Sequence, residues 1–197
     1  MSTVFAEPYT SLTPDAPVVL TVGHSTRSLE DFLRLLQVHK VTYLADVRTV
    51  PRSRHNPQFN RETLPQELEK NGIGYVHLPA LGGLRKARAD SPNMGWRNVS
   101  FRGYADYMLT PEFAVGLQEL IALAGQERVA IMCAEAVPWR CHRSLIGDAL
   151  LVRGLCVEDI MSEQRVAPHK LTPWAQVSGD ALTYPPEVAD ESPPPTP

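Results

Sequence analysis

Short apolar runs alternate with helical segments along this chain, and that alternation constrains the fold more than any other feature of the sequence. Residues 18–22 read Val-Val-Leu-Thr-Val and are followed by a glycine, a pattern typical of a buried strand. Similar runs occupy residues 41–45, 73–78 and 128–133, and residues 157–161 are a weaker fifth candidate. Because the runs are mostly apolar throughout, they predict strands buried on both faces, as in a parallel sheet covered by helices.

The segments between these runs carry signals for helix ends. Ser28 lies three residues before Asp31 and is suited to cap a helix, and Thr110 followed by Pro111 is suited to begin another. Gly72 suits the position just after a helix. Helices are predicted after Ser28, over about 63–71 and 141–153, and in two segments between about 100 and 128. The alternation of strands and helices predicts an α/β fold, a three-layer sandwich with a mostly parallel central sheet.

Composition divides the chain into a central domain and two tails. Residues 176–197 contain six prolines and four acids but no lysine or arginine. A segment of this composition buries too little apolar surface to offset the entropy lost on ordering. We therefore expect an N-terminal tail over residues 1–16, a single α/β domain over 17–176, and a disordered, proline-rich acidic tail over 177–197.

Several protein classes are excluded by simple features of the sequence. No window approaches eighteen consecutive apolar residues, so no membrane-spanning helix is predicted. The first fifteen residues lack the basic and apolar regions of a secretory signal. Three cysteines are an odd number, which does not favour a disulfide scaffold and favours a reduced, cytoplasmic protein. No residue pattern identifies a cofactor or an oligomeric state.

A basic region lies within a chain whose net charge is −3. Residues 46–103 contain ten lysines and arginines against five acids, and aromatic residues are interspersed among them. The arginines fall mostly in predicted loops, and arginine is suited to two-pronged phosphate recognition and to stacking on bases. The partner expected for this region is a phosphate-bearing small molecule or a nucleic acid.

Polar side chains follow four of the predicted strands. In open α/β sheets, ligands bind outside the carboxyl ends of the strands, so side chains from these four ends are expected to meet at one edge. The predicted site residues are His24, Ser25, Asp46, Arg48, Arg52, Arg54, His77, Cys133, Glu135, Arg140, His142 and Arg143.

The segment from Cys133 to Arg143 is open to three interpretations. Cys133 can be a thiol nucleophile at a strand end, although the spacing to Arg140 differs from the Cys-x5-Arg loop of phosphatases. Cys133, Cys141 and His142 can bind a metal, although Cys-x7-Cys-His fits no standard zinc pattern, and no metal is assigned. In the third interpretation Glu135 is the working acid or base, and the cysteines are packing residues.

Four groups of residues, in this order along the chain, resemble one known family. They are Thr21-Val22-Gly23-His24-Ser25, Asp46-Val47-Arg48, Tyr75-Val76-His77-Leu78-Pro79, and Met132-Cys133-Ala134-Glu135 with Cys141-His142-Arg143. Together they resemble the bacterial and archaeal family catalogued as domain of unknown function 488, over roughly residues 18–160. The resemblance implies an α/β domain and a site built from these residues, and it implies no particular reaction.

Three hypotheses for function follow. In the first, a phosphate-bearing ligand binds at the carboxyl edge of the sheet: the five arginines of the predicted site hold its oxygens, His24 and Ser25 supply further donors, and Glu135 or Asp46 transfers protons. In the second, the protein is a thiol-dependent, sulfurtransferase-like enzyme that uses Cys133. In the third, it is a nucleic-acid-binding module without catalytic activity.

Overall fold

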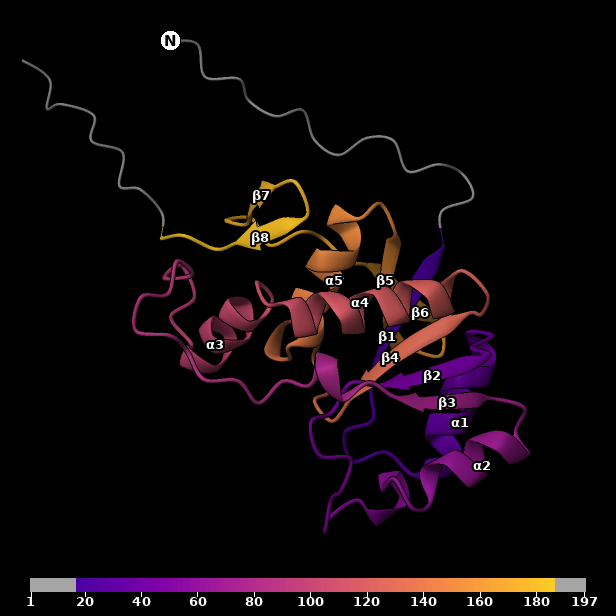
Figure 1. Ribbon diagram of the computed structural model, residues 1–197. Coiled ribbons are helices and arrows are strands. Elements are labelled where there is room, and N and C mark those ends of the chain that lie inside the picture. Colours follow the sequence, from indigo (N-terminus) through magenta and orange to yellow (C-terminus); the bar gives the residue numbers. More distant parts are fainter. Residues whose placement is uncertain (1–16, 187–197) are drawn as a thin grey trace, which may run out of the picture.

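The computed structural model describes residues 17–186, which form a six-stranded sheet, a separate hairpin and five α-helices (Figure 1). The predicted N-terminal tail, residues 1–16, and residues 187–197 lie outside the described part. The sheet strands are β1 (Val18–Gly23), β2 (Tyr43–Asp46), β3 (Gly74–His77), β4 (Val129–Cys133), β5 (Cys156–Ser162) and β6 (Arg165–Pro168). Their order is β3-β2-β4-β1-β5-β6; β6 is antiparallel and the other pairs are parallel. The predicted α/β sandwich with a mostly parallel sheet is confirmed.

Helices cover both faces of the sheet. They are α1 (Leu29–Val38), α2 (Leu64–Lys70), α3 (Val99–Tyr107), α4 (Pro111–Ala124) and α5 (Arg143–Val152). Apolar residues of α1 and α2 pack in one core cluster, and those of α3, α4 and α5 pack in the other, on the opposite face (Figure 1). No helix within residues 17–186 has the length and apolar character needed to cross a membrane.

Successive strand residues enter opposite cores, which explains why the strands are apolar throughout. In β1, Val19 belongs to the core beneath α4 and α5, whereas Leu20 and Val22 belong to the core beneath α1 and α2. In β4, Ile131 and Met132 divide in the same way. Side chains of a strand point alternately to the two faces, so a sheet covered on both faces needs apolar residues at consecutive positions.

The predicted helix ends are confirmed at three positions. The Ser28 hydroxyl accepts a hydrogen bond from the Asp31 backbone N–H at 3.0 Å, and Thr110 caps α4 in the same way. Gly72 follows α2 with φ of +70°, a conformation that a residue without a side chain adopts at little cost.

The order of the strands creates a crevice between β1 and β4. The chain leaves β1 towards α1 on one face of the sheet, but it leaves the neighbouring β4 towards α5 on the other face. The two loops stay hydrogen-bonded as far as the Ser25 N–H and the Ala134 carbonyl, at 2.9 Å, and only then lead to opposite faces. Ligand sites of open α/β sheets are found at such switch points.

The sequence analysis begins the disordered C-terminal tail at residue 177, which is too early, and this boundary needs correction. Strands β7 (Gln176–Ser178) and β8 (Ala181–Thr183) form an antiparallel hairpin, and Leu182 and Tyr184 are buried. The prediction failed because the average over residues 176–197 mixed these two apolar side chains with the prolines and acids that follow. Residues 187–197 lie outside the described part, so the structure describes only the beginning of the segment assigned to the tail.

Asp148 of α5 fastens the C-terminal segment to the sandwich. Its carboxylate accepts hydrogen bonds from His169 Nε2 at 3.0 Å, from the Thr172 backbone at 3.1 Å and from the Tyr184 hydroxyl at 2.9 Å. His169 also contacts Asp159 of β5 through Nδ1, at 3.4 Å. Burial alone would lower the pKa of His169, but the hydrogen bonds and charges of Asp148 and Asp159 raise it to about 9.

We predict that protonation of His169 stabilises the fold in a defined pH range. The pKa is about 9 in the folded state against an ordinary value of 6.5, so the contribution is fully present below pH 6.5 and is lost as the pH rises through about 9. The contribution is about 3 kcal/mol, because a tenfold change in proton affinity corresponds to roughly 1.4 kcal/mol. Urea unfolding of the wild type and His169→Gln between pH 6 and pH 9.5 measures it. A stability difference between the two proteins that does not change over this range would contradict the prediction.

Candidate active site

A cavity of about 690 Å³ opens where the loops after β1, β2 and β4 meet. It lies at the carboxyl edge of the sheet, next to the crevice between β1 and β4. The structure places eight of the predicted site residues in its lining: His24, Ser25, Arg48, Arg52, Cys133, Glu135, Arg140 and His142. The other four, Asp46, Arg54, His77 and Arg143, are not part of the lining.

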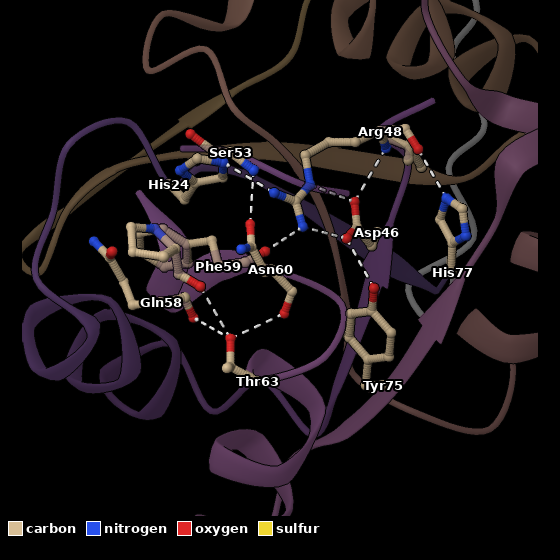
Figure 2. Close-up of polar contacts among 12 residues, drawn as sticks. His24, Asp46, Arg48, Ser53, Gln58, Phe59, Asn60, Thr63, Tyr75 and His77 are labelled. Atoms are coloured by element: carbon tan, nitrogen blue, oxygen red, sulfur yellow. Dashed lines mark hydrogen bonds and ion pairs between the residues drawn. The ribbon is translucent and has the colours of Figure 1, made fainter. Parts of the chain in front are cut away.

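Arg48 lines the cavity and is held in place by other protein groups, whose contacts with it Figure 2 shows. Its guanidinium donates to both carboxylate oxygens of Asp46, at 2.9 and 2.6 Å, and to the backbone carbonyl of Phe59 at 2.7 Å. Both side chains of the ion pair are almost fully buried. Because most N–H groups of the Arg48 guanidinium already donate to other protein groups, these contacts support a structural role for Arg48, in which it shapes the cavity.

Asp46 lies inside the protein and not at the cavity surface. Its carboxylate is completely buried and also accepts a hydrogen bond from the Tyr75 hydroxyl at 2.8 Å (Figure 2). The sequence suggests proton transfer for Asp46, whereas this geometry supports an ion pair with Arg48. His77 is held nearby, since its Nε2 donates to the Arg48 carbonyl at 2.8 Å.

His24 is a neutral, buried link between the loop and the ion pair. Its ring stacks on Phe59 with centroids 4.3 Å apart, and Nδ1 lies 2.8 Å from the Ser25 carbonyl and therefore donates to it. Nε2 is then free to accept from Arg48 at 3.3 Å. Burial lowers the pKa of His24 to about 4, and the positive charges of Arg48 and Arg143 add to the effect. A neutral imidazole in this position does not attract an anion by its charge.

The cations available at the cavity are Arg52 and Arg140. Both are exposed and line the cavity, and Arg52 also forms an exposed ion pair with Glu62 at 2.9 Å. Exposed ion pairs contribute little to stability and exchange readily. No carboxylate of the described residues lies within 4 Å of the Arg140 guanidinium. Arg54 is exposed outside the lining.

Glu135 forms no ion pair with an arginine among the described residues. Its side chain is exposed in the loop after β4 and accepts from the Val137 backbone at 3.1 Å. Arg143 instead donates to the backbone carbonyl of Glu135, at 2.6 Å. Among residues 17–186, Glu135 is the one acid in the cavity lining, so its carboxylate can exchange a proton with a ligand there.

Two cysteines and a histidine meet at the cavity floor. Nδ1 of His142 lies 3.6 Å from the Cys141 sulfur and 3.9 Å from the Cys133 sulfur. The other ring nitrogen, Nε2, lies 3.0 Å from the Val47 carbonyl and donates to it, which leaves a lone pair on Nδ1 facing the sulfurs. Cys133 comes from the end of β4, and the other two residues come from the start of α5.

The two thiols differ in their surroundings. The nearness of Cys133, together with His142 and Arg143, lowers the pKa of Cys141. The nearness of Cys141 and burial raise the pKa of Cys133. Arg143, which is buried, donates from Nε to the Cys141 sulfur at 3.4 Å. These surroundings favour a thiolate on Cys141 over one on Cys133.

Gly83 allows the loop after β3 to close over His142. A Cβ atom at residue 83 would collide with the imidazole ring, above all with Nδ1. The backbone of this loop is thus packed directly against the histidine, and a glycine is needed for that close approach.

Sequence reasoning missed several residues of the lining. Thr49, Ser53 and Asn56 belong to the loop after β2, and Phe101 belongs to α3. The first three follow a strand end and fall under the same rule that selected Arg48 and Arg52, so a search for hydroxyl and amide groups would have found them. Cys141 was considered as a metal ligand but was left out of the predicted site.

Comparison with known proteins identifies the family. A family model described as Domain of unknown function DUF488 matches residues 28–150, and the chain belongs to this family. The match includes Arg48, Cys133 and His142, whereas His24 and Ser25 precede it. No curated protein and no solved structure matches the chain.

We predict that Arg48→Met destabilises the protein by about 3–5 kcal/mol, because it leaves the carboxylate of Asp46 buried without its partner. The double variant Asp46→Asn with Arg48→Met should lose less than the sum of the two single changes. Arg54→Ala is the matched control and should change the stability by no more than about 0.5 kcal/mol. The free energy of unfolding in urea gives all four values. A loss below about 1 kcal/mol for Arg48→Met would show that the ion pair does not support the fold.

Proposed function

We propose that this member of the DUF488 family binds a phosphate-bearing small molecule, of the nucleotide type, in the cavity at the carboxyl edge of its sheet. The observation that carries the proposal is the composition of the lining. It contains the exposed guanidinium groups of Arg52 and Arg140 against a single acid, Glu135. A concave surface with this balance attracts anions, and guanidinium groups match the geometry of phosphate oxygens.

Neutral donors complete the lining. Ser25, Thr26, Thr49 and Ser53 contribute hydroxyl groups, and Asn56 contributes an amide. Hydroxyl and amide groups hydrogen-bond phosphate and sugar oxygens without adding charge. They lie on the loops after β1 and β2, so a ligand bound to them would span the carboxyl end of β4, which lies between these two strands.

The size of the cavity favours a small molecule. Its volume, about 690 Å³, falls within the range of roughly 300–1,000 Å³ for small-molecule sites. The ring of Phe101, which packs against Trp96, also lines the cavity and offers apolar surface suited to a base.

Part of the basic region is engaged in contacts within the protein, which favours a small ligand over a nucleic acid. Several arginines of the region 46–103 are engaged elsewhere: Arg88 pairs with Asp90, Arg102 donates to the Trp96 carbonyl, and Arg85 stacks on Tyr107. A nucleic-acid backbone needs a continuous basic surface. A nucleotide needs only the two exposed arginines and the donors around them.

The thiol-dependent alternative is less well supported for Cys133. Cys133 is mostly buried, and the nearness of Cys141 together with burial raises the pKa of its thiol. A thiol that holds its proton is a poor nucleophile. Reduced cysteines at the cavity accord with the cytoplasmic location proposed from the sequence.

The test is isothermal titration calorimetry with pyrophosphate, nucleoside mono- and triphosphates, and a single-stranded oligonucleotide. Arg52→Ala with Arg140→Ala should weaken nucleotide binding at least about tenfold, because charged hydrogen bonds contribute roughly 1.5–3 kcal/mol each. Arg165→Ala is the matched control. It removes an exposed arginine of β6 that does not line the cavity, and it should leave the affinity unchanged.

Two outcomes would reject the proposal. One is wild-type protein that binds none of these phosphate compounds at low salt. The other is an affinity that falls equally in the Arg165→Ala control. Binding of the oligonucleotide alone would favour the nucleic-acid-binding hypothesis instead.

A further inference from the structure

Three side chains at the cavity floor have the donor atoms and the spacing of a transition-metal site. The sulfurs of Cys133 and Cys141 and Nδ1 of His142 all lie within 4.8 Å of one another. In a tetrahedral zinc site, bonds of about 2.3 Å to sulfur and 2.0–2.1 Å to nitrogen place a sulfur and a nitrogen about 3.6 Å apart. The two sulfur–nitrogen distances here are 3.6 and 3.9 Å. The two sulfur–nitrogen spacings therefore match those of such a site.

The surroundings of these donors orient them for binding a metal. His142 donates from Nε2 to the Val47 carbonyl, which fixes the ring and directs the lone pair of Nδ1 towards the sulfurs. Arg143 donates from Nε to the Cys141 sulfur. Histidine ligands of metals characteristically donate their second ring nitrogen to a carbonyl or carboxylate, and bonds of this kind fix the ligand geometry.

We propose that Cys133, Cys141 and His142 bind a Zn²⁺ ion and leave its fourth coordination position open to the cavity. Two sulfurs and an imidazole suit zinc better than magnesium or calcium, which prefer oxygen ligands. All three residues line the cavity, so an ion among them would be reached from it. The inference does not depend on phosphate binding, because Arg52 and Arg140, the arginines at the rim of the cavity, take no part in it.

The fold explains how these three residues meet although their spacing fits no standard zinc pattern. Cys-x7-Cys-His is longer than the usual zinc spacing of Cys-x2–4-Cys. The intervening loop turns back through a short 3-10 helix, Pro138–Arg140, after which the Cys141 backbone donates to the Pro138 carbonyl at 3.0 Å. This turn brings Cys141 back to the end of β4. The two cysteines therefore lie close together although seven residues separate them in the sequence.

The test begins with full-length protein stripped of metal by a chelator and kept under a reducing agent. We expect it to bind one Zn²⁺ per chain in competition with a chromophoric chelator. Loaded with Co²⁺, it should show the visible absorption of a tetrahedral cobalt site and the sulfur-to-cobalt charge-transfer band. Cys133→Ser, Cys141→Ser and His142→Gln should each weaken zinc binding at least about 100-fold, which is the upper end of the loss seen for outer-shell changes.

Cys156→Ser is the matched control, because Cys156 is the remaining free cysteine and does not line the cavity. It should bind zinc as the wild type does. Gly83→Ala leaves all three donors in place but puts a methyl group against Nδ1, and it should also weaken binding. Circular dichroism and thermal unfolding show which variants remain folded.

The wild-type measurement alone can overturn the inference, whether or not a variant folds. Reduced wild-type protein that binds no zinc, or that binds cobalt without a sulfur charge-transfer band, would overturn it. Zinc binding that persists in folded Cys133→Ser and Cys141→Ser would do the same. Arg52→Ala with Arg140→Ala should keep the metal even if it loses the phosphate ligand, so the two proposals can fail separately.

Discussion

The buried ion pair of Asp46 and Arg48 holds the carboxyl edge of the sheet together. A carboxylate and a guanidinium can be buried only if nearly all of their hydrogen-bonding groups find partners. Here the pair satisfies this need by contacting Tyr75 of β3, the backbone of Phe59 and the ring of His24 after β1. Three segments that are distant in sequence are thereby fixed around one charge pair. The shape of the cavity wall follows from this requirement, because the loop after β2 must fold back to present the Phe59 carbonyl.

A second buried guanidinium, that of Arg143, organises the opposite wall. No carboxylate of residues 17–186 lies within 4 Å of it. Its partners are the Glu135 carbonyl, the Cys141 sulfur and, at 3.5 Å, the Thr21 hydroxyl. Thr21 in turn donates to Asp159, which contacts His169. A chain of polar contacts therefore connects the cavity floor, through the sheet, with the residues that bind the C-terminal segment. A negative charge on Cys141 would balance the positive charge of Arg143.

The sequence could predict the sheet and the edge at which the site forms, because both follow from local patterns. It could not tell which polar residues after a strand turn inward. Asp46 and His77 end adjacent strands, as Cys133 does, yet the first is buried in the ion pair and the second bonds a backbone carbonyl. That choice depends on partners such as Tyr75, which lie on other strands and have no sequence signature relative to Asp46. The order of the segment 176–184 was missed for a similar reason. Its buried residues are few, and the partner of Tyr184 is Asp148, which lies on α5.

The two proposals for the cavity assign different tasks to its rim and its floor. A zinc ion with two thiolate ligands carries no net charge, so it would add little to the attraction of an anion, which falls to Arg52 and Arg140. What the ion would add is a Lewis acid that polarises an oxygen bound at its open position. Glu135, the acid of the lining, is on the loop that joins Cys133 to Arg140, between floor and rim. An anion held by Arg52 and Arg140 would therefore bring its oxygens near both a polarising centre and a group able to accept a proton.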